Sequence, residues 1–138
     1  MLSTIEKVIF LKGVSLFEHI PPNDLIVIAQ ISHEENIPKS HPVFKENDSG
    51  DSLYLIVSGE VLIHKDSEEL ANIGSGDVFG EMAILDSEPR SASATTKGDS
   101  VLLKIEREDF SDLLHEKPEI SLGIIRVLCT RLRGANRK

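Results

Sequence analysis

The sequence predicts a mainly β domain with flanking helices, in which eight short strands form a β-roll or jelly roll. Two observations predict this fold. Segments rich in β-branched and apolar residues follow one another over 31–106, with turn sequences between them, and helical patterns stand only before and after. A chain of 138 residues is long enough for one domain with a core and too short for two ordinary ones. We therefore predict a single domain over 1–138, with helices over 1–30 and 107–138.

The first thirty residues predict two helices. Ser3 and Glu6 form a capping-box pattern, apolar residues follow, and Gly13 ends the first helix. The consecutive prolines at 21 and 22 precede a second helix over 23–30, because proline is favoured in the first turn.

The central region predicts strands joined by tight turns. SLYLIVSGEVLIH, residues 52–64, indicates a strand, a turn at Ser58-Gly59 and a returning strand. Other turn sequences are NDSGD at 47–51, DS at 66–67, GSGD at 74–77 and KGD at 97–99. The candidate strands are 31–37, 42–45, 52–58, 60–65, 70–73, 77–79, 92–97 and 100–106.

The C-terminal residues predict two more helices. The first covers 108–116 and is broken at Pro118, because proline cannot continue a helix interior. The second covers 119–132 and carries an apolar stripe. The stripe consists of Ile120, Ile124, Leu128 and Leu132. Because we expect the roll to cover this stripe, we predict that the isolated chain is a monomer.

Composition limits the function and the setting. The 15 Lys and Arg against 23 Asp and Glu give a formal net charge of −8. General nucleic-acid binding needs a basic face, so we expect no nucleic-acid partner through this chain alone. The single cysteine, Cys129, cannot form an internal disulfide, no apolar run reaches the length of a membrane span, and no signal peptide is present. We predict a cytoplasmic protein, or a cytoplasmic piece of a larger one.

No catalytic or metal site is predicted. The five histidines include no H-x-H pair, which would place two imidazoles on one face of a strand. Convergence of His33, His41 and His64 in space would make the chain a cupin-like jelly-roll metalloenzyme, and this alternative stays open. Separate surface histidines are the simpler interpretation. The sequence has no G-x-S-x-G nucleophile motif.

The stretch FGEMAILDSEPRSASATT, residues 79–96, carries the candidate site. Its glycine, Gly80, lets the backbone approach a ligand closely, and a helical turn over 81–85 would point free N–H groups at an anion. Arg90 can clamp an anion through two parallel hydrogen bonds. Glu81 needs a donor, for which a sugar hydroxyl is suitable. The pattern favours a sugar phosphate over the alternative of two solvated surface charges.

This stretch closely resembles the phosphate-binding cassette of cyclic nucleotide-binding domains, F-G-E-[LM]-A-L-x-x-x-x-P-R-[ATS]-A-[ST], with the cassette at 79–94. Such domains occur in regulatory subunits of cAMP-dependent protein kinase, in cyclic-nucleotide-gated channels and in the bacterial catabolite activator protein. SLYLIVSGEVLIH and IGSGDVFGE are also similar to this family, and the resemblance covers roughly 16–132.

The resemblance implies roles for individual residues. Arg90 would bind the cyclic phosphate, assisted by Ser91 and by backbone N–H groups near Ala83. Glu81 would accept a hydrogen bond from the ribose 2′-hydroxyl, with the Gly80 backbone nearby. The candidates for contacting the base are Val61, Ile63, Met82 and Ala92, together with Arg131 or Asn136 from a final helix acting as a lid. Alternatively, Arg126, Arg131, Arg133 and Arg137 only solvate that helix.

The resemblance thus implies a non-catalytic regulatory domain that senses a cyclic nucleotide and needs no cofactor besides this ligand. We expect cAMP rather than cGMP, because Ser91 stands where cGMP-selective members commonly have threonine. No output region follows Lys138, so we expect a fragment of a larger signalling, transport or transcription protein, or a chain acting through a protein partner. A degenerate domain that no longer binds nucleotide is a further alternative.

Overall fold

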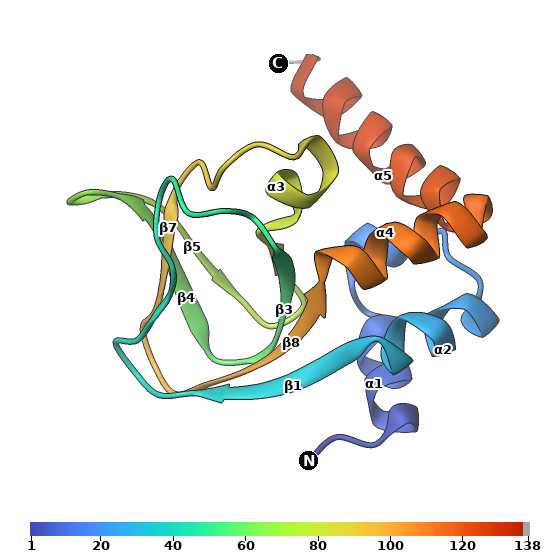
Figure 1. The fold of residues 1–138 in the computed structure, drawn as a ribbon, viewed down its shortest axis with the longest axis horizontal. Coiled ribbons are helices and arrows are strands. Elements are labelled where there is room, and N and C mark those ends of the chain that lie inside the picture. The colour runs from blue at the N-terminus through green and yellow to red at the C-terminus, as the bar shows by residue number, and fades with distance from the viewer. Residues whose placement is uncertain (137–138) are drawn as a thin grey trace. The chain divides into compact units, whose positions relative to one another are not determined.

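The computed structural model describes residues 1–136, apart from the side chain of Ala83. Figure 1 shows the order of helices and strands along the chain. Two compact units can be distinguished. One is a helical unit, formed by residues 1–31 together with the chain from 109 onward, and the other is a β-roll unit over 32–108.

The β-roll unit consists of two four-stranded antiparallel sheets, ordered β1-β8-β3-β6 and β2-β7-β4-β5. The predicted eight-stranded roll with flanking helices is therefore confirmed. A short helix, α3 (Glu81–Asp86), lies between the sixth and seventh strands. The strands are β1 (Ser32–Ile37), β2 (Pro42–Phe44), β3 (Ser52–Ser58), β4 (Glu60–Lys65), β5 (Glu68–Gly74), β6 (Val78–Phe79), β7 (Ser93–Thr96) and β8 (Ser100–Glu106).

A hydrophobic cluster fills the space between the two sheets. Val61 on β4 and Ala94 on β7 pack against side chains of the other sheet. Burying one large apolar side chain stabilises a fold by about 1.5–3 kcal/mol, so this cluster holds the sheets together. The residues of the other sheet in this cluster are Tyr54, Ile56, Phe79 and Leu102.

The β3–β4 turn shows why a glycine is needed at one predicted position. Gly59 has φ +104°, a conformation that side chains other than glycine rarely adopt. A Cβ at Gly59 would also lie 2.7 Å from Cα of Ser100. The turn sequence Ser58-Gly59 thus joins the two strands as the sequence predicts.

The helical unit contains the remaining helices. Its first helix begins with a complete capping box, in which Glu6 N donates to Ser3 Oγ (3.1 Å) and Ser3 N donates to Glu6 Oε1 (3.0 Å). An ion pair between Lys117 Nζ and Asp24 Oδ1, 3.5 Å apart, links the start of the last helix to the second. The helices are α1 (Thr4–Leu11), the 3₁₀ helix η1 (Ser15–Phe17), α2 (Pro22–Gln30), α4 (Arg107–Glu116) and α5 (Pro118–Asn136).

The apolar stripe predicted for α5 is only partly buried. Ile120 and Ile124 are buried, but Leu132 is 64% exposed. Twelve residues at 3.6 per turn rotate a side chain by about 120°, so a strict four-residue spacing leaves the buried face. The buried face instead includes Gly123 and Val127. The expectation that the whole stripe is covered is therefore wrong at Leu132, while the monomer itself stays a prediction.

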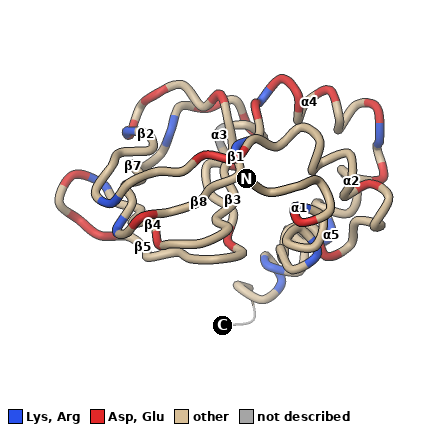
Figure 2. Tube along the Cα trace, turned by 90° about the horizontal axis from the view of Figure 1, so that it is seen from below, with Lys and Arg blue, Asp and Glu red and all other residues tan. Residues whose placement is uncertain are grey.

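Charges are distributed unevenly along the chain. Asp and Glu occur throughout both units, whereas every charged residue of α5 beyond Glu119 is an arginine (Figure 2). Within residues 1–136, the structure contains no helix that is both long and apolar enough to cross a membrane.

Candidate functional site

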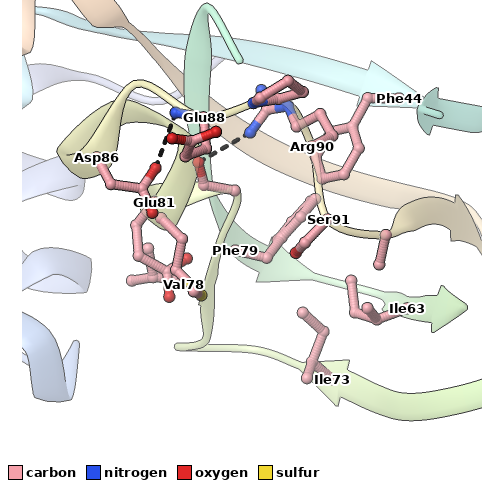
Figure 3. A pocket seen from close by; sticks show the side chains of 14 residues that line it. Phe44, Ile63, Ile73, Val78, Phe79, Glu81, Asp86, Glu88, Arg90 and Ser91 are labelled. Atoms are coloured by element: carbon pink, nitrogen blue, oxygen red, sulfur yellow. Dashed lines mark hydrogen bonds between the residues drawn. The ribbon is translucent and has the colours of Figure 1, made fainter. Parts of the chain in front are cut away.

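The β-roll unit contains a cavity of about 280 Å³ (Figure 3). Its walls come from β2, β4, β5 and β6, from the start of α3, and from the segment that leads into β7. Seven of the residues proposed from the sequence line this cavity. These are Ile63, Gly80, Glu81, Met82, Arg90, Ser91 and Ala92.

Arg90 lies at the wall of this cavity, and the residue is only 3% exposed. Nη1 donates to the Gly80 carbonyl (2.8 Å) and Nη2 donates to the Ser52 carbonyl (2.6 Å). One face of the guanidinium lies over the Phe44 ring, with Cζ 4.0 Å from the ring centroid. Nε is buried and has no hydrogen-bond partner within the described part of the chain. The side chain is thus fixed, with one donor unsatisfied.

The backbone of Arg90 is held by a turn that is distant in sequence. Its N–H donates to the Asp48 carbonyl, and its carbonyl accepts from Asn47 N, both at 2.8 Å. Asn47 has φ +73°, a conformation that asparagine tolerates better than most residues. The NDSGD turn therefore positions the start of the Arg90 side chain.

Arg90 brings a positive charge into a mostly apolar cavity. Burial lowers the pKa of its guanidinium, and the nearby Tyr54, Asp51, Asp48 and Glu81 act in the opposite direction. Because arginine stays protonated in proteins, the lowered pKa does not remove the charge at neutral pH. A buried cation of this kind favours an anionic ligand.

Gly80 joins β6 to α3 in a conformation that only glycine adopts easily. It is the N-cap of α3, with φ +79°, and a Cβ there would lie 2.6 Å from Nη1 of Arg90. Glu81, half-buried, is the first residue of α3 and faces the cavity, whereas Met82 is 62% exposed. Ala83 belongs to α3, but its side chain lies outside the described residues.

Apolar side chains form part of the cavity wall. Ile63 and Ala92 are joined there by Ile73 and Val78, which the sequence reasoning missed. No alternating pattern marks them, since β5 exposes its first five residues and β6 is only two residues long. Val61 is fully buried in the cluster between the sheets and is not part of the cavity wall.

Comparison with known proteins identifies the family. Residues 34–117 match the family model of the cyclic nucleotide-binding domain, which includes the whole cavity-forming segment from 79 to 94. This chain belongs to the cyclic nucleotide-binding domain family.

Relatives of this cyclic nucleotide-binding domain include regulators and kinase subunits. The CRP-like cAMP-activated global transcriptional regulator of Mycobacterium tuberculosis is 35% identical over 126 residues, which are 88% of this chain and 56% of that protein. The cAMP-dependent protein kinase regulatory subunit of Aspergillus niger is 36% identical, over 76% of this chain and 26% of that protein. The chain thus spans about half the length of its bacterial relative and less of the kinase subunit.

Solved structures of the family have the same fold. The catabolite activator protein of Thermus thermophilus matches with a TM-score of 0.76 and 34% identity, over 88% of this chain and 60% of that one. The sensor domain of the regulator DNR from Pseudomonas aeruginosa has a TM-score of 0.80, over 98% and 94% of the two chains. At 21% identity, the similarity to the DNR sensor domain concerns the fold alone.

The two lid candidates of this cyclic nucleotide-binding domain lie on α5, in the helical unit. Arg131 Nη2 donates to Ser15 Oγ at 3.0 Å, and both Arg131 and Asn136 are exposed. Arg137 lies outside the described residues. The hydrogen bond to Ser15 gives Arg131 a partner within its own unit, and a role of either residue toward the base stays a prediction.

The histidines considered for a metal site lie apart in the domain's secondary structure. His33 is on β1, His41 precedes β2, and His64 is on β4, where Nε2 lies 3.0 Å from Thr95 Oγ1. Within residues 1–136, no three His, Cys, Asp or Glu side chains are grouped so that they could hold a metal ion.

Proposed function

We propose that this domain binds cyclic AMP in the cavity beside Arg90 and acts as a non-catalytic regulatory module. One observation carries the proposal. Arg90 is a buried cation at the wall of an apolar cavity, and its Nε has no partner among the described residues. Buried polar groups are almost always hydrogen-bonded, so an unsatisfied buried donor beside a cavity favours a ligand that supplies an acceptor. A phosphate oxygen supplies both the acceptor and the opposite charge.

The remaining walls are suited to the other parts of a nucleotide. The Ser91 hydroxyl adds a donor beside Arg90, and the Glu81 carboxylate, which accepts only, is suited to the ribose 2′-hydroxyl. Ile63, Ile73 and Val78 offer an apolar surface for the base. The volume of about 280 Å³ is near the lower end of the range for small-molecule sites, as expected for a single nucleotide.

We propose cAMP as the preferred ligand because Ser91 replaces the threonine expected for cGMP. Two of the relatives named above are described as cAMP-activated or cAMP-dependent. A cGMP-dependent protein kinase of Toxoplasma gondii is nevertheless 37% identical over 99 residues, so relatedness alone does not choose the base. We expect cAMP to bind about tenfold more tightly than cGMP, a difference of about 1.4 kcal/mol.

Regulation would follow from a difference in affinity between two conformations. A ligand that binds one conformation more tightly shifts the population toward it, and whatever contacts the domain responds. The response itself would come from another part of a longer protein or from a protein partner.

Calorimetric titration with cAMP, cGMP, adenosine and 5′-AMP tests the proposal. We expect saturable binding of cAMP with one site per chain, weaker binding of cGMP, and no detectable binding of adenosine, which lacks the phosphate. Equal binding of adenosine would show that Arg90 does not recognise the phosphate. If neither cyclic nucleotide binds at millimolar concentration, the proposed function is wrong and the chain is a degenerate member of its family.

A further inference from the structure

Phe44, to which the sequence analysis assigns no role, lies directly against the candidate anion-binding residue. It is the last residue of β2, is half-buried and lines the cavity. Its ring faces the Arg90 guanidinium at 4.0 Å from the centroid to Cζ. A cation over an aromatic face within about 6 Å is attracted by the ring quadrupole. The contact joins two segments that are distant in sequence.

Two buried aromatic rings hold the Phe44 ring in its orientation. Its centroid lies 6.1 Å from that of Tyr54 and 5.9 Å from that of Phe79, with interplanar angles of 37° and 38°. Tyr54 and Phe79 stack on each other at 5.2 Å and are nearly inaccessible to solvent. Aromatic pairs at these distances are attractive and restrict one another. The ring beneath Arg90 therefore has little freedom to tilt.

The guanidinium is thus constrained in two independent ways. The carbonyls of Gly80 and Ser52 accept from Nη1 and Nη2, which fixes its edge, and Phe44 fixes one face. Two of the five N–H donors of an arginine are used in this way, and the partnerless Nε is not among them. These two hydrogen bonds leave three of the five donors for other acceptors.

The absence of a side chain at Gly80 lets the Arg90 guanidinium and the Phe44 ring pack closely against the backbone. A Cβ at Gly80 would lie 2.6 Å from Nη1 of Arg90 and 3.4 Å from Cε2 of Phe44. Residues from β2, from the start of α3 and from the segment before β7 therefore meet at one point. Movement of any one of them would displace the guanidinium.

We propose that Phe44 is a positioning residue for anion binding, which holds the Arg90 guanidinium by a cation–π contact in the orientation that presents its free donors to the ligand. This inference rests on the proposed function, since the ligand is a cyclic nucleotide. Preorganisation of this kind raises affinity because the side chain need not be ordered when the ligand binds.

Substitution of Phe44 in the whole chain tests the inference. Phe44→Leu should weaken cAMP binding about three- to thirtyfold, the range expected for a partly desolvated cation–π contact. Replacing Phe44 by trifluorophenylalanine, which keeps the shape and weakens the quadrupole, should give an intermediate loss. In the Arg90→Ala background, Phe44→Leu should change the affinity by less than about twofold, because the two residues act as one unit.

Ile37→Ala is the matched control. Ile37 is half-buried against the same aromatic and aliphatic cluster and does not line the cavity. It should lower the stability of the ligand-free chain as Phe44→Leu does, while cAMP affinity stays at the parent value. If the parent, the Phe44→Leu chain and the fluorinated chain bind cAMP with equal affinity, the positioning role of Phe44 is overturned. It is also overturned if Phe44→Leu weakens cAMP binding as much in the Arg90→Ala background as in the parent.

A ligand-free measurement separates this inference from the proposed function. Protons above a ring face are shifted upfield, so the Arg90 Nε–H resonance should move downfield in Phe44→Leu and stay in place in Ile37→Ala. If the parent binds no cyclic nucleotide, the proposed function is wrong. The proposed positioning of Arg90 for that ligand is then wrong as well, even when the Arg90 Nε–H resonance shifts in Phe44→Leu. If the parent binds and the resonance does not shift, only the role of Phe44 is wrong.

Discussion

Replacing Arg90 by alanine should separate the role of this residue in ligand binding from its role in folding. Removing one partner of a buried charge pair typically costs about 2–5 kcal/mol, so cAMP affinity should fall by roughly thirtyfold to several thousandfold. From the sequence alone, a pocket-facing side chain would be expected to leave ligand-free stability unchanged. The structure changes that expectation, because the guanidinium donates to the carbonyls of Gly80 and Ser52.

The size of the stability effect follows from these two carbonyls. A buried acceptor left unsatisfied lowers the free energy of unfolding by about 1–3 kcal/mol. Removing a buried charge also removes its desolvation penalty, which offsets part of this loss. We therefore expect Arg90→Ala to lower the free energy of unfolding by about 1–3 kcal/mol in the absence of ligand. Arg90→Lys should recover part of the affinity, because an ammonium keeps the charge and loses the planar set of donors.

Urea unfolding without ligand and calorimetry with cAMP measure the two effects separately. Ligand stabilises a fold by RT ln(1 + [L]/Kd), so concentrations of cAMP that raise the melting temperature of the parent should leave that of Arg90→Ala unchanged. An Arg90→Ala chain that is folded, or refolded, and binds cAMP with the parent affinity would refute the reasoning. Arg90 would then be a structural residue only.

Three further predictions concern other parts of the molecule. Glu81→Ala should lower cAMP affinity by about 1.5–3 kcal/mol, the value of a hydrogen bond to a charged group, and calorimetry with 2′-deoxy-cAMP should show no difference between this variant and the parent. Ser91→Thr should raise cGMP affinity about tenfold and leave cAMP affinity nearly unchanged, and competition between the two nucleotides measures this ratio. The isolated chain should sediment as a monomer at micromolar concentration. A concentration-independent dimer would contradict this prediction, and its loss in Leu132→Glu would show that the exposed residues of α5 form the dimer contact.

The positions of the strands and the local turns could be predicted because their signals are local. The capping box at Ser3, the turn at Ser58-Gly59 and the break at Pro118 each depend on residues within a few positions, and each lies where it was predicted. Helix α5 extends to Asn136, beyond the predicted end at 132, and continues through Gly134.

The candidate site was predictable where its residues are adjacent and not where they meet through folding. Glu81, Arg90 and Ser91 lie in one segment with an informative spacing, and the structure brings them to one cavity. Phe44 reaches this cavity through the pairing of β2 with the distant β7, and the Ser52 carbonyl reaches the Arg90 side chain from β3, so no local pattern marks either of them. The contact of either lid candidate with a base stays a prediction.

The pairing of the first strand of the roll with the last sets the order in which the domain can be assembled during synthesis. β1 pairs with β8, from Ser32 opposite Ile105 to Ile37 opposite Ser100, and β2 pairs with β7. Contacts between such distant segments carry a high entropic cost of loop closure and slow folding. A nascent chain cannot close either sheet until its final strands have left the ribosome, so the ability to bind ligand arises late and all at once. Truncation before β8 (Ser100–Glu106) would therefore be expected to remove binding rather than weaken it.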